Sequence, residues 1–173
     1  MTNIVSGIVW DACCLLTLMA TDRAEYILTA IQKAGTRSFV VKEVKEGEVL
    51  YLRPDDPEAD STEKHDVSLD ELVTKGLLIE TTLTDTEQAA FVYWAAEIDD
   101  GEAYSLALAQ ERGYSVATDD QATLNQMKQQ TPPIPALTTP DWLKEWLEMT
   151  QADETVVREI IGRVERRARY APR

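Results

Sequence analysis

The sequence has few of the residues that mark several common kinds of site. Among its 173 residues are two cysteines, adjacent at Cys13 and Cys14, and one histidine, His65. Adjacent cysteines have poor geometry for a disulfide and lack the spacing of a metal site, so we interpret both as small buried apolar residues. The chain also has no glycine-rich phosphate-binding loop. These absences argue against a zinc site, a disulfide framework and a nucleotide-binding P-loop.

Long hydrophobic runs are also missing. Hydrophobic residues make up 44% of the chain, but no run approaches the roughly 18 residues that suggest a membrane-spanning helix. The first residues, "MTNIVSGIVWDACCLL", do not resemble a signal peptide, because they lack a basic segment and Asp11 interrupts the apolar one. We therefore expect a cytoplasmic protein with no membrane partner, whose first residues form a core strand.

Basic residues are scarce and unevenly placed. The 17 lysines and arginines face 31 acids, for a net charge of −14, which argues against a simple nucleic-acid reader with a basic surface. Residues 155–173 nevertheless hold six arginines and two glutamates, which leaves a charge of −18 on residues 1–154. Residues 55–71 alone hold eight acids and one lysine. The sequence thus predicts a strongly polarised molecule.

Strand-like and helix-like apolar spacing alternate along the chain. The pattern predicts strands at 3–10, 38–41, 77–83, 114–117 and 133–137, an inserted strand or hairpin at 48–52, and helices at 23–35, 68–76, 87–98, 101–112 and 138–149. Alternating strands and helices indicate a mostly parallel sheet covered on both faces. We therefore predict a three-layer α/β/α domain over residues 1–150, followed by a basic amphipathic helix at 151–173.

Several residues support the helix boundaries and the core. Capping boxes are predicted at Ser68–Glu71 and Thr84–Glu87, and Thr139 is the predicted N-cap of the 138–149 helix, with Pro140 at its first position. Glycines are predicted to end three helices, at Gly35, Gly76 and Gly113. The aromatic residues expected in the core are Tyr93, Trp94, Trp142 and Trp146, whereas His65 lies in an acidic loop and is expected to be solvated.

Carboxylates follow the predicted strands at the positions where ligands bind in such sheets. Asp11 follows the first strand, Glu43 follows the second, and Asp119 and Asp120 follow the strand at 114–117, while Glu102 opens the helix before that strand. The carboxyl ends of parallel strands share one edge of the sheet, so these acids are expected to meet there. Some acids at such positions only cap helices, which is our interpretation of Asp100. Asp11 lies between two apolar segments, where a buried and unpaired charge is costly. It therefore needs a partner from elsewhere in the fold, and a metal ion is one such partner.

Bringing four carboxylates together is costly. One like-charge pair at about 4 Å costs roughly 4 kcal/mol at an effective dielectric of about 20. The acids must therefore be partly protonated or attract cations. Oxygen ligands suit Mg²⁺ or Mn²⁺, and such a site activates water and stabilises a phosphoryl oxygen. The acids thus point to metal-assisted hydrolysis of a phosphodiester.

Four segments in this order resemble the PIN domain: "IVWDACCLLTL", an acid after the second strand, "DDGEAYSLALAQERGYSVATDD", and "PALTTPDWLKEWL". PIN domains are Mg²⁺- or Mn²⁺-dependent ribonucleases and include the toxins of many bacterial toxin–antitoxin pairs. The resemblance spans residues 4–149, and its most specific part is "GEA-x5-A-x3-G-x4-TDD". It implies a parallel sheet flanked by helices, RNA as substrate with products bearing 5′-phosphate and 3′-hydroxyl ends, and an antitoxin, another protein or a second copy of the chain as partner.

The family's acids are carried over one at a time. Asp11 matches the acid after the first strand, and Glu43 the acid that opens the second helix, with Glu46 as its alternative. Glu102 matches the acid at the start of the "EAYSLALA" helix. The family's Thr-x-Asp spacing selects Asp120 as the last acid, and Asp119 stays an alternative metal ligand. The predicted catalytic residues are thus Asp11, Glu43, Glu102 and Asp120, and the predicted metal ligands are these four and Asp119.

The sequence departs from the family in two ways. Many PIN domains have Ser or Thr just after the first acid, where Ala12 and Cys13 stand here, so a hydroxyl beside the metal ligands is missing. The loop at 47–67 and the tail from Gln151 are additions.

A receiver domain would need an acid pair after the first strand, and a haloacid-dehalogenase phosphatase would need an acid where Cys13 stands. The strongest alternative to a nuclease is a non-catalytic PIN-like scaffold that binds proteins through its acidic surface.

The tail "TVVREIIGRVERRARY" predicts an amphipathic helix. Such a helix packs its apolar stripe on its own domain, or docks on a second protomer or partner. Its arginines either offset the repulsion between the acidic domain and RNA phosphates, or pair with the protein's own acids. The stripe is Val156, Val157, Ile160, Ile161 and Val164, and the arginines are Arg158, Arg163, Arg166, Arg167 and Arg169.

Overall fold

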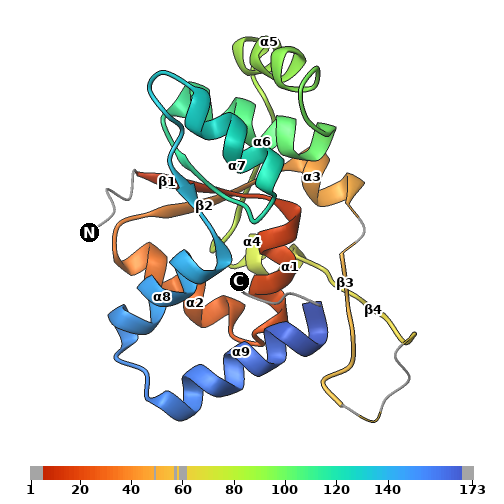
Figure 1. Cartoon of the computed structure of the whole chain (residues 1–173), viewed down its shortest axis with the longest axis vertical. Coiled ribbons are helices and arrows are strands. Elements are labelled where there is room, and N and C mark those ends of the chain that lie inside the picture. Colours follow the sequence, from red (N-terminus) through yellow and green to blue (C-terminus); the bar gives the residue numbers. More distant parts are fainter. Residues whose placement is uncertain (1–5, 49, 57, 59–61, 169–173) are drawn as a thin grey trace.

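A five-stranded parallel sheet forms the centre of the computed structural model, which describes residues 6–48, 50–56, 58 and 62–168 (Figure 1). The strand order is β5-β2-β1-β6-β7, and each neighbouring pair is parallel. The strands are β1 (Gly7–Trp10), β2 (Arg37–Val41), β5 (Ile79–Thr81), β6 (Ser115–Ala117) and β7 (Ala136–Leu137). The predicted mostly parallel α/β/α fold is confirmed, and residues 3–5 of the first predicted strand lie outside the described residues.

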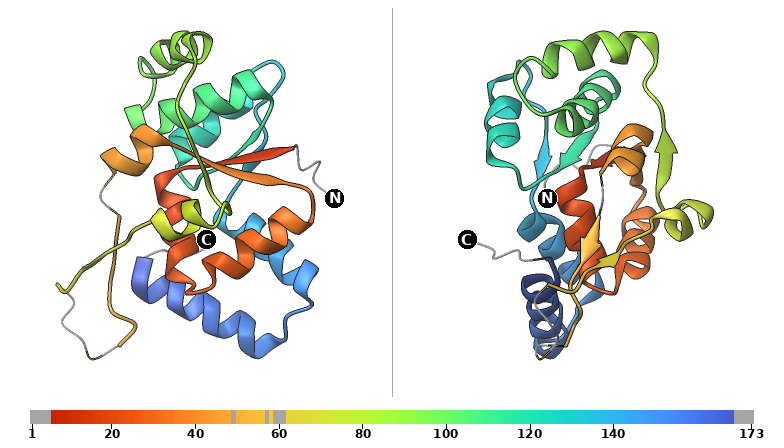
Figure 2. Two further views of the ribbon diagram at one scale, coloured as in Figure 1. Left: turned by 180° about the vertical axis from the view of Figure 1, so that it is seen from behind. Right: turned by 90° about the vertical axis from the view of Figure 1, so that its right-hand side faces the viewer.

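Helices cover both faces of this sheet (Figures 1 and 2). α5 (Asp85–Trp94) and α6 (Asp100–Arg112) pack on each other over one face. α1 (Ala12–Ala20), α2 (Ala24–Lys33) and α8 (Thr139–Thr150) lie over the other face. The shorter helices are α3 (Lys42–Gly47), α4 (Asp70–Thr74) and α7 (Gln121–Gln129). None of the helices in the described residues is long and apolar enough to span a membrane.

The central strands are buried on both faces, as expected for a parallel sheet under two helical layers. All four residues of β1 are buried, and the ring of Trp10 meets that of Trp142 edge to face at 5.7 Å. Trp94 and Trp146 are also buried, so the prediction that the tryptophans form core is confirmed. The same prediction for Tyr93 is wrong, because its side chain is 57% exposed. α5 rests on α6 rather than on the sheet, so its outer face meets solvent.

Helix ends agree with the sequence at some positions and not at others. The Thr84–Glu87 capping box forms, and Gly113 ends α6 in the left-handed conformation, with φ +66°. The Ser68–Glu71 box does not form, because α4 begins at Asp70 and the Glu71 carboxylate pairs with a lysine one turn later. The N-cap of α8 is Thr138, not the predicted Thr139. The hydroxyl of Thr138 donates a hydrogen bond to Asp141 at 2.6 Å. The backbone N–H of Thr139 donates instead to Asp119.

The insertion after α3 forms an antiparallel hairpin of β3 (Tyr51–Leu52) and β4 (His65–Asp66). His65 is exposed, as predicted. The polar helix α7 was not among the predicted helices, because its glutamine-rich sequence has little apolar spacing.

The C-terminal helix α9 (Glu154–Ala168) packs on its own domain, mainly along α1 (Figures 1 and 2). Ile160 and Val164 are buried, with 0% and 3% of their surface exposed. Val156 and Ile161 pack against the core from partly buried positions. Of the two predicted roles of the apolar stripe, the structure therefore shows packing on the chain's own domain.

Candidate active site at the carboxyl edge of the sheet

Asp11 lies at the point where the two central strands end. Its backbone N–H donates to the carbonyl of Ala117 at 3.0 Å, which joins the end of β1 to the end of β6. Its side chain is only 2% exposed and does not cap α1. Instead Oδ2 accepts hydrogen bonds from Thr118 Oγ1 and Cys13 Sγ, each at 3.1 Å. Burial outweighs these hydrogen bonds and raises the pKa of Asp11 above its ordinary value.

Thr118 supplies a hydroxyl beside Asp11. Many members of the family have such a hydroxyl just after the first acid, where Ala12 and Cys13 stand here. Thr118 follows β6, 107 positions after Asp11. Its Oγ1 also accepts a hydrogen bond from the backbone N–H of Asp120 at 3.2 Å. Sequence reasoning did not give Thr118 a role, although it is the first residue of the "TDD" motif. One hydroxyl therefore positions two of the predicted site segments.

Glu102 has the most informative electrostatic environment of the predicted acids. It lies in the first turn of α6 and is partly buried. Burial, followed by the negative charges of Asp11, Asp120 and Asp99, raises the pKa of Glu102 to about 7. The structure therefore brings the start of α6 to the ends of β1 and β6, as the predicted helix–strand unit required.

Glu43 comes directly after β2, in the first turn of α3, and α3 packs against α6. Its Oε2 is buried and has no hydrogen-bond partner among the described residues. Glu46, the alternative, is exposed and pairs with Lys42 at 3.7 Å. Since buried carboxylate oxygens rarely go without a partner, Glu43 fits the position of a ligand better than Glu46.

Glu48 is an acid at this edge that sequence reasoning missed. A Cβ atom added to Gly101, next to Glu102, would lie 2.9 Å from Glu48 Oε1, so the Glu48 carboxylate reaches the start of α6. Its charge also contributes to the raised pKa of Asp11. Nothing in its sequence position, at the end of α3, marks this contact.

Asp119 and Asp120 face different neighbours. Asp119 accepts hydrogen bonds from the backbone N–H of Thr139 at 2.7 Å and from its hydroxyl at 2.5 Å, so this carboxylate faces the start of α8. Asp120 caps α7 by accepting from Thr123 N–H at 2.7 Å, and its charge raises the pKa of Glu102. Successive residues that leave a strand point to opposite sides. The structure thus supports Asp120 rather than Asp119 as the carboxylate on the Glu102 side.

The four predicted carboxylates have no cationic partner among the described residues. Asp11, Glu43, Glu102 and Asp120 take part in none of the ion pairs between described residues, although other acids, such as Glu87, do. These four acids offer only oxygen donors, and one of those oxygens is buried without a partner. The residues therefore fit a hard divalent cation such as Mg²⁺ or Mn²⁺.

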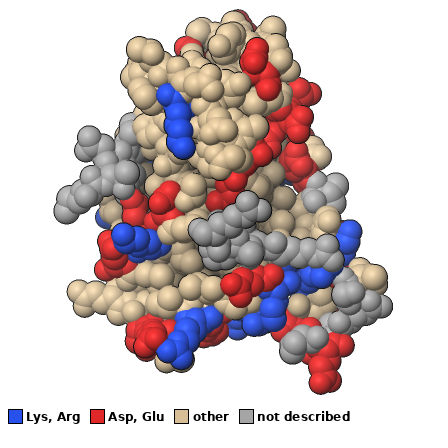
Figure 3. Space-filling view, in the orientation of Figure 1, with Lys and Arg blue, Asp and Glu red and all other residues tan. Residues whose placement is uncertain are grey.

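The predicted carboxylates are not tightly gathered in the absence of a cation. Among the described residues, one group of three possible metal ligands has its ligand atoms within 4.8 Å of one another. This group is Cys13, Cys14 and Asp119, and it does not include the four predicted carboxylates. The exposed acids on one side of the upper half of the molecule are visible in Figure 3, over α3, α5 and α6.

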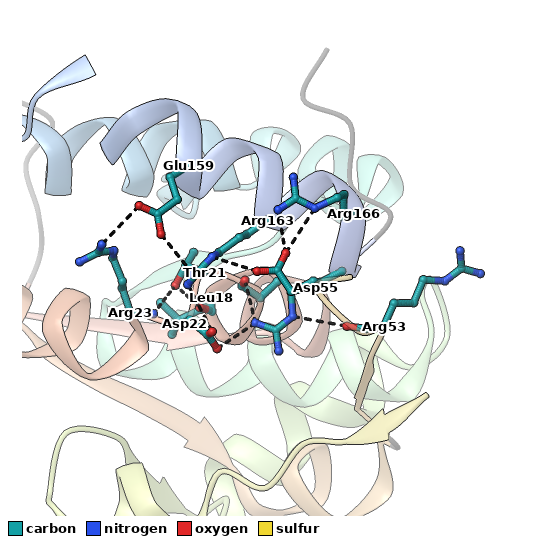
Figure 4. Close-up of polar contacts among 11 residues, drawn as sticks. Leu18, Thr21, Asp22, Arg23, Arg53, Asp55, Glu159, Arg163 and Arg166 are labelled. Atoms are coloured by element: carbon teal, nitrogen blue, oxygen red, sulfur yellow. Dashed lines mark hydrogen bonds and ion pairs between the residues drawn. The ribbon is translucent and has the colours of Figure 1, made fainter. Parts of the chain in front are cut away.

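The α9 arginines pair with the protein's own acids (Figure 4). Arg163 lies 3.2 Å from carboxylate oxygens of Asp22, Asp55 and Glu159. The remaining described arginines pair in the same way: Arg166 with Asp55, Arg167 with Asp22, and Arg158 with Glu154. Arg169 lies outside the described residues. Acidic and basic side chains accordingly interleave over α9 in Figure 3. Of the two predicted roles for these arginines, the structure shows pairing within the chain.

Comparisons of the chain with models of protein families, with curated proteins and with solved structures gave no match. The functional argument therefore depends on the residues and the geometry described above.

Proposed function

We propose that this chain is a PIN-like, metal-dependent endoribonuclease that hydrolyses RNA phosphodiester bonds at the carboxyl edge of its sheet. The observation that carries the proposal is the environment of Glu102. Burial and the charges of Asp11 and Asp120, acids from two other segments, raise its pKa to about 7. None of the ion pairs between described residues includes any of these three acids. Proteins tolerate such clusters of like charge mainly at functional sites.

The roles of the residues follow from their contacts. Asp11, Glu43, Glu102 and Asp120 would hold one or two Mg²⁺ or Mn²⁺ ions, and a bound ion of this kind supplies an activated water and stabilises charge on a phosphoryl oxygen. Thr118 and Cys13 fix the orientation of the Asp11 carboxylate through hydrogen bonds to its Oδ2. The pKa of Glu102 is about 7 in the metal-free protein, and a bound cation would favour its ionised form, so Glu102 would act as a ligand.

The proposed setting is the cytoplasm, with single-stranded RNA as the substrate and an antitoxin, another protein or a second copy of the chain as partner. A second candidate is a non-catalytic PIN-like scaffold. The internal pairing of the α9 arginines favours it, because these side chains are then not available to attract RNA phosphates.

Replacing Asp11 by Asn tests the proposal. The wild type should cleave single-stranded RNA when Mg²⁺ or Mn²⁺ is present and leave 5′-phosphate ends, and a chelator should stop the cleavage. Asp11→Asn should lower the rate by at least about 100-fold, the upper end of what removal of outer-shell groups costs. It should keep or raise the stability of the metal-free protein, because it removes a buried charge.

The matched control is Asp66→Asn, which neutralises an exposed aspartate on the hairpin. It should cleave RNA as the wild type does. If the wild type cleaves no RNA at millimolar Mn²⁺ over varied sequences, the scaffold replaces the nuclease as the explanation. Unchanged cleavage by Asp11→Asn would show that the site is wrongly assigned.

A further inference from the structure

Two adjacent thiols and one carboxylate from a distant segment meet beside Asp11, although adjacent cysteines lack the sequence spacing of a metal site. Cys14 is buried as predicted, whereas Cys13 is partly exposed. Cys13 and Cys14 lie in the first turn of α1, and Asp119 follows β6, more than 100 positions later. Cys14 Sγ lies 3.4 Å from Asp119 Oδ2. Cys13 Sγ accepts a hydrogen bond from the backbone N–H of Asp119 at 3.3 Å. One ligand atom from each of the three residues lies within 4.8 Å of the others.

We propose that Cys13, Cys14 and Asp119 form a binding site for a thiophilic divalent cation such as Zn²⁺, separate from the oxygen site of the four carboxylates. Two sulfurs and one oxygen are the donors of tetrahedral zinc, whereas Mg²⁺ and Mn²⁺ select oxygen. The two neighbouring sites therefore discriminate between cations by the chemistry of their donor atoms.

The observed distances are close to those that a zinc ion requires. Zn–S bonds of about 2.3 Å and Zn–O bonds of about 2.1 Å give a tetrahedron with S···O edges of about 3.6 Å and an S···S edge of about 3.8 Å. The distance of 3.4 Å between Cys14 Sγ and Asp119 Oδ2 already matches the first edge. No separation within the group exceeds 4.8 Å, so none has to shorten by more than about 1 Å.

The surroundings support a cation held by these donors. Thr139 donates two hydrogen bonds to the Asp119 carboxylate and fixes its orientation, as outer groups do at metal sites. Burial, Cys13 and Asp119 raise the pKa of the Cys14 thiol, so a bound cation has to displace the thiol proton. A water can fill the fourth position, and the Asp11 carboxylate, whose Oδ2 lies 3.1 Å from Cys13 Sγ, is next to the site.

A cation at this site would alter the neighbouring carboxylate site. Cys13 Sγ would bind the cation in place of its hydrogen bond to Asp11, and the positive charge would lie next to that carboxylate. We therefore expect Zn²⁺ to inhibit RNA cleavage in the presence of Mn²⁺. This consequence rests on the proposed function, whereas the binding of Zn²⁺ does not.

Cobalt titration tests the binding directly. Co²⁺ is added to the reduced full-length protein in a large excess of Mg²⁺, which occupies the oxygen sites. One equivalent of Co²⁺ should produce the near-ultraviolet absorption of a cobalt–thiolate bond, and one equivalent of Zn²⁺ should remove it. Cys13→Ser and Cys14→Ser should each weaken binding at least tenfold, and Asp66→Asn should leave it unchanged.

The choice of variants keeps the test decisive. Cys14 is fully buried, so Cys14→Ser could lower stability, whereas Cys13 is partly exposed and its serine can still donate to Asp11. Absence of cobalt–thiolate absorption in the wild type, or equal binding by folded Cys13→Ser, would overturn the proposal.

The RNA assay then tests inhibition. Zn²⁺ should inhibit the wild type and not Cys13→Ser, and equal inhibition of both would show that Zn²⁺ acts at the carboxylates, which would overturn the inhibitory role. A wild type without nuclease activity would refute the proposed function, while the cobalt titration would still decide whether the thiol site exists.

Discussion

Replacing Glu102 by Gln should stabilise the metal-free protein at neutral and alkaline pH. Glutamine keeps the size of the side chain and its capacity to accept hydrogen bonds, but removes its negative charge. In the folded protein that charge is disfavoured by burial and by Asp11, Asp120 and Asp99. The variant therefore measures how strongly the cluster opposes folding when no cation is bound.

The magnitude follows from the pKa of Glu102, which rises from an ordinary 4.5 to about 7. At about 1.4 kcal/mol per unit this corresponds to at most about 3.5 kcal/mol, and we halve the figure because solvent reaches part of the side chain. We thus expect Glu102→Gln to raise the free energy of unfolding by about 1–2 kcal/mol at pH 8.

The pH dependence gives the sign. Between pH 4.5 and about 7 the folded wild type binds more protons at Glu102 than the unfolded chain does, so this group lowers the stability as the pH rises. Below pH 4.5 the carboxyl is protonated in both states, and the variant should be no more stable than the wild type. Above pH 7 the difference should be constant.

The assay is urea unfolding with a chelator present, at pH 4, 6 and 8. Glu111→Gln is the matched control, because Glu111 lies on the same helix and is exposed. It should show no comparable gain. If Glu102→Gln is no more stable than the wild type at pH 8, or if its gain is the same at every pH, the carboxylates do not repel one another as the structure indicates. Added Mn²⁺ should stabilise the wild type more than the variant.

Two further substitutions test the packing and the α9 contacts. A Cβ atom at Gly7 would lie 2.9 Å from two stacked aromatic rings, so Gly7→Ala should lower the free energy of unfolding by about 1–3 kcal/mol. A Cβ atom at Gly47 would have no atom within 4 Å, so Gly47→Ala should not lower it. Equal effects of the two substitutions in urea unfolding would contradict this packing. Arg163→Gln should destabilise by about 1–2 kcal/mol, because Arg163 contacts three carboxylates, and Arg158→Gln by about 0.5 kcal/mol or less, because this exposed arginine has one ion pair. Similar thermal unfolding of these two variants would show that the contacts in Figure 4 contribute little.

The sequence by itself predicted the class of fold and the edge of the sheet to which Asp11, Glu102 and Asp120 belong. Apolar spacing predicted the strands and most helices, because periods of two and of about 3.6 residues show directly which face is buried. The position of Asp11 after a strand, and of Glu102 one helix and one strand before Asp120, was enough to place these acids together. That inference needs only the rule that a helix returns the chain to the start of the next parallel strand.

Local signals were weaker where two interpretations shared one pattern. Ser68 and Glu71 have the spacing of a capping box, but the N-cap of the helix is Leu69, one residue later. Tyr93 follows the apolar pattern of α5, but this helix packs on α6 and leaves Tyr93 exposed. The polar helix α7 has no apolar stripe wide enough to predict it. In each case the decisive contact is with another element, which spacing along the chain does not describe.

Only the tertiary structure decided which neighbours the individual side chains face. It turned Asp119 toward Thr139 and the two thiols, and it placed Asp120 where its charge acts on Glu102. It also brought Thr118 to Asp11 across 107 positions. Spacing along the chain determines which edge of the sheet a residue reaches. The direction of its side chain there depends on hydrogen bonds and charges from segments far away in sequence, and these exist only once the chain has folded.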